Sequence, residues 1–218
     1  MNIHDLIEET LRSNKYTKKL LLIRHGTSLG NITPRIHGNS EYPLTPKGEA
    51  QAEELGLHLR KYIDKIVQIR SSNLIRSLDT CRVALQMSVH KELYEKFLID
   101  PRLKEFGFGI WENTPLSPQV RSEDLEVLYA CLMKGHIRPF NGDDVETFEQ
   151  NLWSSFNETL PNGLNLYFTH SGVIYTATKD IDEKFFIGQC GVAAFVFDDF
   201  TKERQLVGIC DGTHEHFV

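Results

Sequence analysis

The sequence predicts an α/β fold, because short apolar runs of strand length alternate along the chain with segments of helical periodicity. The strand-like runs lie at residues 20–23, 66–69 and 164–168. Polar residues end each run, and a helical pattern follows the second and the third. The length of 218 residues and the composition, 40% hydrophobic and 25% charged, are typical of one globular domain with a single large core.

Helices are predicted between and after these strands. In the segment 46–62, Pro46 stands at a favoured first helical position, and apolar residues follow it at helical spacing. The same pattern predicts the remaining helices, at 74–87, 123–134 and 146–160. The chain ends differently, because 192–197 and 205–210 have the pattern of two strands joined by a polar connection. We expect this last pair to extend the sheet.

Residues 1–17 precede the first strand and have a helical pattern of their own. Apolar residues fall on one face of the predicted helix, namely Ile3, Leu6, Ile7 and Leu11. We expect this N-terminal helical extension to pack on the surface of the domain that follows, residues 18–218. A helix that docks on a partner or on a membrane is disfavoured, because its polar face carries acidic residues rather than a basic stripe.

Charged and polar side chains follow the ends of the three predicted strands. Arg24 and His25 end the first strand, and His170 follows the third. Ser72 follows the second strand as a candidate N-cap, which places Arg76 in the first turns of a helix, where the dipole favours an anion. Ligands of open α/β sheets bind at the carboxyl ends of strands. The sequence therefore predicts that two histidines and two arginines converge there to hold a phosphoryl group without a metal.

Five ordered blocks of the chain resemble the motifs of the histidine phosphatase superfamily, the phosphoglycerate mutase-like proteins. They are Arg24-His25-Gly26-Thr27-Ser28-Leu29-Gly30-Asn31, Arg35-Ile36-His37-Gly38, Ser71-Ser72-Asn73-Leu74-Ile75-Arg76, Leu103-Lys104-Glu105-Phe106-Gly107-Phe108-Gly109-Ile110-Trp111-Glu112 and Thr169-His170-Ser171-Gly172. The resemblance runs from about residue 20 to near the C-terminus. It implies a three-layer sandwich in which a mostly parallel central sheet is flanked by helices.

The resemblance also implies roles for single residues. His25 is expected to attack phosphorus as a neutral imidazole and to form a phosphohistidine. The oxygens of the phosphoryl group are expected to be stabilised by Arg24, Arg76 and His170. Glu105 is expected to protonate the leaving oxygen and then to accept a proton from the attacking water. If Glu105 lacks this role, the alternative acids are Glu41, Glu112 and Asp143.

Substrate-binding residues are expected at the edges of these motifs. Ser28 and Asn31 are candidate donors to the phosphate, and the backbone N–H of Ser171 can face it. His37 and Gly38 are expected in a loop that covers the pocket, where a role in the turn itself is equally favoured. The chain departs from the family pattern at a few positions, which are Thr27, Asn113, Ser171 and Tyr175.

The predicted function is that of a metal-independent phosphatase, similar to the α-ribazole and broad-specificity phosphatases of the superfamily. A phosphoglycerate mutase-type phosphotransferase is the alternative within the superfamily, although Phe108 stands where the mutases have a tyrosine. A catalytically weak module that recognises phosphate is the alternative from another class. We expect no metal and no other cofactor, because arginines supply the positive charge; His214 and His216 suggest a metal only weakly.

The composition of the chain disfavours some kinds of partner and indicates the compartment. The net charge of −6 disfavours a nucleic-acid partner, and no apolar run has the length of a membrane span. The cysteines have no ligand-like spacing and are expected to be free thiols, at Cys81, Cys131, Cys190 and Cys210. We therefore expect a small phosphorylated substrate as partner and the cytoplasm as compartment. A homodimer is compatible with the sequence, which leaves the oligomeric state open.

Overall fold

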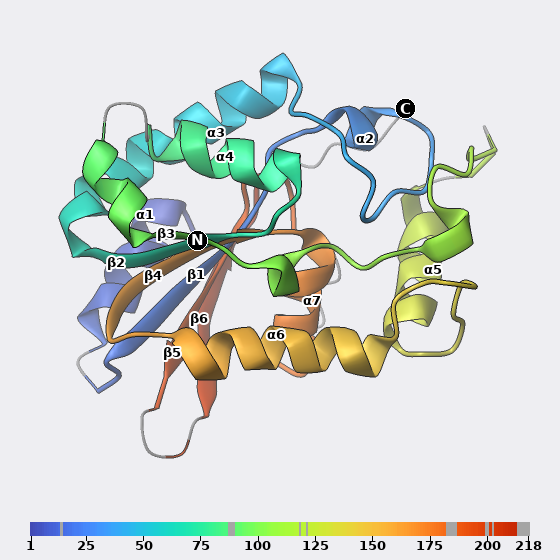
Figure 1. The fold of residues 1–218 in the computed structure, drawn as a ribbon. Coiled ribbons are helices and arrows are strands. Elements are labelled where there is room, and N and C mark those ends of the chain that lie inside the picture. The colour runs from blue at the N-terminus through green and yellow to red at the C-terminus, as the bar shows by residue number, and fades with distance from the viewer. Residues whose placement is uncertain are drawn as a thin grey trace.

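A twisted sheet between two layers of helices forms the protein (Figure 1). The computed structural model describes residues 1–13, 15–86, 90–117, 119–120, 122–181, 187–198, 201 and 203–212. Among these residues, six strands lie in the order β3-β2-β4-β1-β5-β6. They are β1 (Lys18–Arg24), β2 (Ile66–Ser71), β3 (Phe97–Ile99), β4 (Gly163–Thr169), β5 (Val192–Phe197) and β6 (Arg204–Cys210). The predicted strands are all present, and β3 adds a short edge strand that the sequence analysis missed.

The sheet is mostly parallel, as expected. Strands β1, β2, β3 and β4 pair in parallel, and β5 runs antiparallel to both of its neighbours, β1 and β6. The expected terminal pair therefore does extend the sheet beyond β1. The predicted α/β fold with a mostly parallel central sheet is confirmed.

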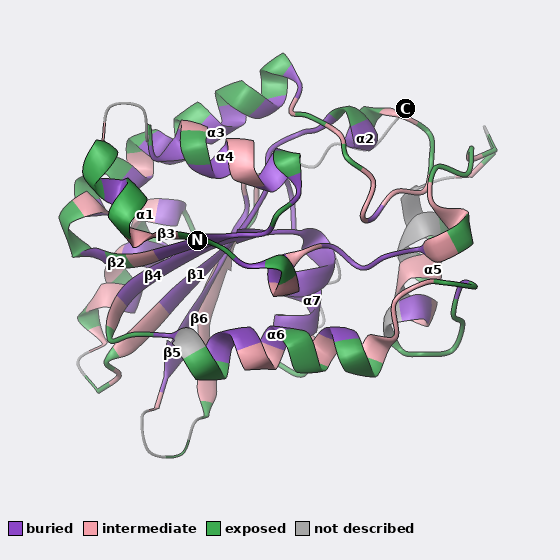
Figure 2. Cartoon of the chain, viewed as in Figure 1, coloured by how far each residue is buried: buried purple, intermediate pink, exposed green. Residues whose placement is uncertain are grey.

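The two helical layers follow from alternation along the buried strands. In β1, Leu21 and Ile23 belong to one hydrophobic cluster, whereas Leu20 and Leu22 belong to the other, because successive side chains of a strand point to opposite faces. Helices α1 (Ile3–Arg12), α3 (Pro46–Leu59) and α4 (Ile75–Ala84) cover the first face; α5 (Ser122–Met133), α6 (Val145–Thr159) and α7 (Ser171–Thr178) cover the second. Figure 2 shows the inner strands buried, β6 largely half-buried, and the outer faces of the helices exposed.

Short helical pieces connect these elements. They are α2 (Leu29–Ile32) and the 3₁₀ turns η1 (Arg60–Lys65), η2 (Lys91–Lys96), η3 (Pro101–Leu103) and η4 (Gly109–Trp111). The helix predicted over 46–62 ends as an α-helix at Leu59 and continues as η1. Its N-cap is Thr45, whose hydroxyl accepts from the N–H of Gly48 at 3.1 Å.

One predicted cap is wrong. Helix α4 begins at Ile75, and its N-cap is Leu74 rather than Ser72. The hydroxyl of Ser72 lies 2.7 Å from the ring of His170, so its hydrogen bond serves a long-range contact instead of the helix end. Its distance from the N–H of Leu74 is 3.4 Å, at the limit of a hydrogen bond.

The N-terminal helix is part of the core. Leu6 and Ile7 of α1 are fully buried and share a cluster with Leu21 and Leu166 of the sheet. The hydroxyl of Tyr62 adds a polar contact, because it donates to Glu8 at 2.8 Å. Truncating a buried leucine to alanine costs about 2–5 kcal/mol, so α1 makes a substantial contribution to the stability of this layer.

The strand register aligns three chain segments at one edge of the sheet. Arg24 at the end of β1 is level with Thr169 at the end of β4, and Ser71 at the end of β2 is level with Phe168. The residues that follow these ends therefore lie next to one another. None of the helices in the described residues combines the length with the hydropathy that a membrane span requires.

Candidate active site

His25 is the first residue after β1, and its ring is held in one tautomer. Nδ1 lies 2.7 Å from the carbonyl oxygen of Gly26, which can only accept, so Nδ1 carries the proton. Nε2 then has a lone pair, and it accepts a hydrogen bond from Nε of Arg76 at 3.2 Å. The side chain is buried, with 4% of its surface exposed. The fold thus presents an unprotonated ring nitrogen beside a guanidinium group.

Arg76 extends from the first turn of α4 into the site and is fully buried. Besides Nε2 of His25, it binds two backbone carbonyls of one loop: Gly38 at 2.6 Å and Ser40 at 2.9 Å. The hydroxyl of Thr80, one turn along α4, accepts from the N–H of Gly26 at 2.9 Å. Helix α4 therefore fixes both the guanidinium group and the backbone next to His25.

Arg24 and His170 bring two more nitrogen groups to the same place. The rings of His25 and His170 have their centroids 5.1 Å apart. Arg24 donates from Nη1 to the carbonyl of Ile187 at 2.5 Å, whereas its Nε has no partner within the described chain. Nδ1 of His170 and Oγ of Ser171 are likewise buried without a hydrogen-bond partner among the described residues. Buried polar atoms are rarely left unpaired, and each of these three nitrogen and oxygen atoms is able to donate a hydrogen bond to an anion.

Ser72 contacts the other ring nitrogen of His170. Its hydroxyl lies 2.7 Å from Nε2 of the ring and can donate to it or accept from it. In the tautomer in which Ser72 donates, Nδ1 carries the proton and is a donor for a ligand. The candidate cap Ser72 is therefore a site residue that the sequence analysis assigned to the wrong task.

The electrostatic surroundings keep both rings neutral. Burial, reinforced by the positive charge of Arg76 and Arg24, holds the pKa of His25 well below 6.5. Burial and Arg76 do the same to the pKa of His170. Burial lowers the pKa of Arg24 to about 10, so this guanidinium stays charged at neutral pH. Neutral imidazoles beside positive guanidinium groups suit a nucleophile that attacks an anion.

Glu105 lies in the loop after η3, with 7% of its surface exposed. Its Oε2 accepts from the N–H of Gly172 at 3.2 Å, which ties it to the start of α7 beside His170. Its Oε1 accepts from the hydroxyl of Tyr129 at 2.7 Å. Tyr129 was missed by the sequence analysis, because nothing in its neighbourhood on α5 distinguishes it from a core aromatic.

The alternative acids are engaged elsewhere. Glu112 accepts hydrogen bonds from the N–H groups of residues 38, 39, 40 and 108 and from the hydroxyl of Ser40. Burial alone would raise the pKa of Glu112, but the hydrogen bonds from Ser40 and the backbone bring it below its ordinary value. Glu41 accepts from the N–H of Ile75 and Asp143 from that of Gly107. Glu105 is thus the carboxylate placed at the site.

Glu112 and Arg76 hold the 38–40 loop from two sides. The carboxylate binds the N–H groups of the loop, and the guanidinium binds its carbonyl oxygens. A side chain at Gly38 would place Cβ 2.0 Å from the carbonyl oxygen of Phe106. Gly38 therefore allows the backbones of two loops to approach each other closely. Its carbonyl oxygen also accepts a hydrogen bond from Arg76.

The other expected binding residues lie around this loop. Ser28 and Asn31 form a capping box at α2, where Oδ1 of Asn31 accepts from the N–H and the hydroxyl of Ser28 at 2.9 and 3.0 Å. This cap uses the amide oxygen of Asn31. The ring of His37 packs over Gly30, where an added Cβ would lie 2.8 Å from it. Burial lowers the pKa of His37 to about 4, so its ring is neutral.

The departures from the family pattern have local explanations. Asn113 has a φ of 63°, in the left-handed region that glycine occupies freely and asparagine tolerates better than most residues. Tyr175 is buried within the second hydrophobic cluster. Thr27 is buried, its N–H donates to Gln51 at 2.8 Å, and its hydroxyl has no partner in the described chain.

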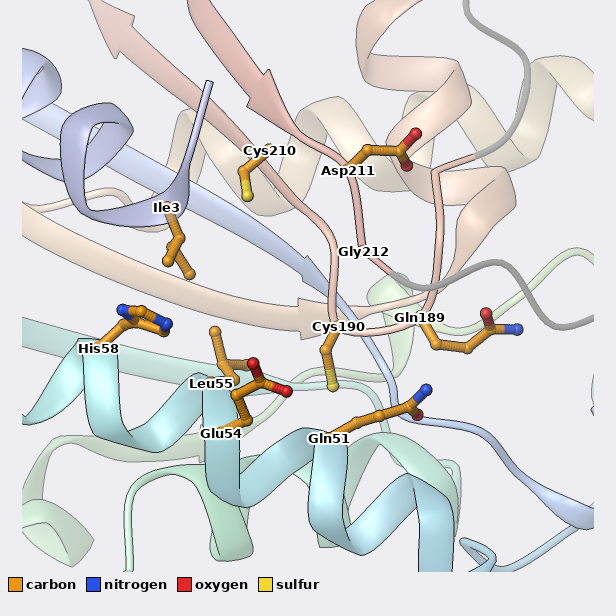
Figure 3. A pocket seen from close by; sticks show the side chains of 10 residues that line it. All are labelled: Ile3, Gln51, Glu54, Leu55, His58, Gln189, Cys190, Cys210, Asp211 and Gly212. Carbon is orange, nitrogen blue, oxygen red and sulfur yellow. The ribbon is translucent and has the colours of Figure 1, made fainter.

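A cavity of about 230 Å³ lies near the site but separate from it (Figure 3). It is lined by residues of α1, α3 and the ends of β5 and β6: Ile3, Gln51, Glu54, Leu55, His58, Gln189, Cys190, Cys210, Asp211 and Gly212. None of the expected site residues is among them.

Among the residues that the structure describes, no cluster of three or more His, Cys, Asp or Glu is arranged to hold a metal ion. His214 and His216 lie outside the described residues.

A comparison with protein-family models identifies the family. Residues 20–194 match the model of the histidine phosphatase superfamily (branch 1). The match covers most of the chain and includes the ends of β1, β2 and β4 with their arginines and histidines. The chain belongs to the histidine phosphatase superfamily, and the resemblance noted in its motifs is confirmed.

Curated relatives share only part of their length with this chain. A "Probable phosphoglycerate mutase GpmB" of Yersinia enterocolitica is 30% identical over 106 residues, and a protein of the same name from Escherichia fergusonii is 32% identical over 106 residues. Each match covers 49% of this chain and 46% of the relative. The matched segment thus spans about half the length of these relatives.

Solved structures share the fold over nearly the whole chain. A "putative alpha-ribazole-5'-P phosphatase" of Escherichia coli K-12 superposes with a TM-score of 0.67 at 23% identity, covering 93% of this chain and 98% of that one. A phosphoglycerate mutase of Thermus thermophilus gives a TM-score of 0.64 at 24% identity, with coverages of 90% and 99%. At these identities the likeness establishes the fold, and it includes neighbours with both kinds of name.

Proposed function

We propose that the protein is an enzyme that hydrolyses phosphate monoesters without a metal ion, through a phosphohistidine on His25. One observation carries the proposal: three buried polar atoms close to His25 lack partners in the described chain. They are Nε of Arg24, Nδ1 of His170 and Oγ of Ser171. A buried polar atom without a partner costs about 1–3 kcal/mol, and the oxygens of a bound phosphoryl group would satisfy all three.

The roles follow from the positions of the groups. Nε2 of His25 attacks phosphorus while Nδ1 keeps its proton on the carbonyl of Gly26. The guanidinium groups of Arg24 and Arg76 and the N–H of His170 stabilise the negative charge that is spread over the phosphoryl oxygens. Glu105 protonates the leaving oxygen and later takes a proton from the water that releases phosphate.

Phosphate release tests the proposal. We expect the wild-type protein to release phosphate from 4-nitrophenyl phosphate and from members of a panel of phosphorylated metabolites. His25→Ala should release none, whereas His136→Ala, at an exposed position outside the site, should keep the wild-type rate. A His25→Ala protein that hydrolyses at the wild-type rate would exclude the covalent route. A wild-type protein that binds phosphate but turns over no ester would instead favour a phosphate-recognising module.

A mutase-type phosphotransferase is the second candidate, because the curated relatives are named probable phosphoglycerate mutases. The two activities differ in their products. With 3-phosphoglycerate as substrate, a phosphatase releases inorganic phosphate, whereas a mutase moves the phosphoryl group to another hydroxyl and keeps the ester. We expect release of phosphate as the main outcome for this chain.

A further inference from the structure

The carboxylate of Glu105 accepts hydrogen bonds from separate parts of the chain. Oε1 accepts from the hydroxyl of Tyr129 at 2.7 Å and from the N–H of Phe106 at 2.9 Å. Oε2 accepts from the N–H of Gly172 at a longer 3.2 Å. The two oxygens therefore differ, because one has two donors at short range and the other has one weaker donor.

Tyr129 is fixed in its position by aromatic packing. Its ring lies against that of Phe108, with centroids 5.7 Å apart and planes at 60°. Phe108 is itself buried and packs edge-on against Phe106 at 5.7 Å. The loop that carries Glu105 and the helix that carries Tyr129 thus share an aromatic contact beside their hydrogen bond.

The hydroxyl of Tyr129 is a constant donor. Burial, together with the charge of Glu105 and the hydrogen bond to it, raises the pKa of Tyr129 well above 10. The phenol therefore keeps its proton at neutral pH and can donate it to the carboxylate.

The start of α7 packs closely against these two groups. A Cβ at Gly172 would lie 1.9 Å from the hydroxyl oxygen of Tyr129 and 2.2 Å from Oε1 of Glu105. An added side chain at this position would therefore displace the phenol or the carboxylate. The backbone of α7, the carboxylate and the phenol are thus in mutual contact, next to His170.

We propose that Tyr129 is a positioning residue that holds Oε1 of Glu105 and thereby directs Oε2 to the oxygen of the leaving group. The inference rests on the proposed function. In the first step, Nε2 of His25 forms a bond to phosphorus, the bond from phosphorus to the ester oxygen breaks, and that oxygen takes the proton from Oε2. In the second step, water forms a bond to phosphorus, its proton goes to Oε2, and the bond to Nε2 breaks. The phenol keeps its own proton throughout.

Tyr129→Phe removes the hydroxyl and keeps the ring, so it tests this role. A misplaced general acid slows the reaction of an ester with a poor leaving group more than that of an ester with a good leaving group. We expect kcat/KM for an alkyl phosphate to fall roughly 10- to 100-fold, as expected for a displaced catalytic group. This ratio reports the transfer of the phosphoryl group to His25 and not the later attack of water, which is common to all esters. For 4-nitrophenyl phosphate, whose leaving group needs little protonation, kcat/KM should change much less. Inhibition by inorganic phosphate should stay unchanged, because the phosphoryl ligands are intact.

The effect of Tyr129→Phe is compared with that of Glu105→Gln, alone and in combination, and with a control variant. Glu105→Gln should lower kcat/KM for the alkyl phosphate by roughly 10²- to 10⁴-fold, the usual contribution of acid–base catalysis. Adding Tyr129→Phe to Glu105→Gln should cause no further loss, because residues that act through one another are not additive. Tyr94→Phe is the matched control: Tyr94 is 52% exposed and lies in η2, away from the site.

Each contrary outcome has a distinct meaning. Equal losses of kcat/KM on both esters, or additive losses in the double variant, would make Tyr129 a merely structural residue and overturn the inference. Unchanged kcat/KM on both esters would overturn it as well. A wild-type protein that hydrolyses neither ester would instead contradict the proposed function and, with it, the role of Tyr129.

Discussion

The molecule buries arginine side chains in two places at one edge of the sheet and supplies a carboxylate partner in only one of them. The buried Arg70 and the half-buried Arg102 both pair with Asp100, at 2.6 and 2.9 Å. Arg24 and Arg76 are also buried, but no carboxylate of a described residue lies within ion-pair distance of either. The first group is neutralised by carboxylates of the chain, whereas we propose that the phosphoryl group of a substrate neutralises the second.

The pKa directions in the two places reflect this difference. Around Asp100, burial would raise the pKa, but the hydrogen bonds from Arg102, Ser155 and Arg70 lower it to about 2. At Arg24, burial is the largest cause and lowers the pKa to about 10. At Asp100, the effect of its charged hydrogen-bond partners on the pKa is therefore larger than the effect of burial. At Arg24, the effect of burial on the pKa is larger than that of the nearby charges. Buried positive charge without a partner is a functional signal, and buried positive charge with a partner is a structural one.

The largest expected effect is on stability, at the paired site. Asp100→Asn leaves two guanidinium groups beside a neutral amide, and breaking such a buried pair costs about 3–5 kcal/mol in free energy of unfolding. Denaturant unfolding measures the loss. The exposed pair of Asp79 and Arg82 is the control, since Asp79→Asn should cost at most about 1 kcal/mol. Equal small losses at both positions would remove the distinction between the two arginine groups.

The second effect is on activity, at the unpaired site. Arg24→Met removes charge that lacks a partner, so we expect kcat to fall roughly 10²- to 10³-fold while the melting temperature stays the same or rises. Phosphate release and thermal unfolding give the two readouts. Arg82→Met, at an exposed position, should change neither. An Arg24→Met protein that unfolds easily and remains active would place Arg24 in the structural group.

A smaller effect concerns the pH dependence of stability at His37. The pKa of this ring is about 4 in the folded protein against 6.5 for an ordinary histidine. Between these values the unfolded chain binds more protons, so the contribution of His37 is full above pH 6.5 and is lost as pH falls toward 4. Between about pH 7 and about pH 5, the wild type should lose about 2 kcal/mol more than His37→Gln.

Denaturant unfolding at the two pH values measures this difference. His136→Gln, at an exposed position, is the control and should follow the wild type. A His37→Gln protein that also loses stability as steeply as the wild type would show that the ring is protonated in the folded state.

The smallest expected effect is that of a chelator. The positive charge at the site comes from Arg24 and Arg76, so activity should be the same with and without EDTA. Vanadate should inhibit, because its five-coordinate form resembles the transition state of an in-line displacement. Loss of activity in EDTA and its recovery with a divalent ion would mean that the two arginines do not suffice for phosphoryl transfer.

The sequence predicted the parts of the site that lie at strand ends. His25, His170 and Arg76 follow apolar runs, and parallel strands bring their carboxyl ends together whatever the details of packing. The fold class was predictable for the same reason, because alternation of runs and helical patterns is local. The extra strand β3 was missed, since three residues are too few for a pattern.

The long-range hydrogen bonds that hold Glu105 and the 38–40 loop in place could not be predicted. Tyr129 reaches Glu105 across 24 positions, and Glu112 reaches the 38–40 loop across more than 70. Such hydrogen bonds depend on how loops of different elements pack, and no local spacing encodes them. Ser72 shows the same limit, because its position matched a helix cap while its hydroxyl bonds to His170.

The central claim is that the unpaired arginines surround a nucleophile, and trapping the covalent intermediate tests it most directly. Wild-type protein is mixed with a phosphate ester, quenched with alkali on a short time scale, digested and examined by mass spectrometry. We predict one phosphoryl group on His25, stable in alkali and lost in acid, reduced in Arg24→Met and absent in His25→Ala. Turnover without any phosphorylated His25, or phosphate trapped on another residue, would contradict the account.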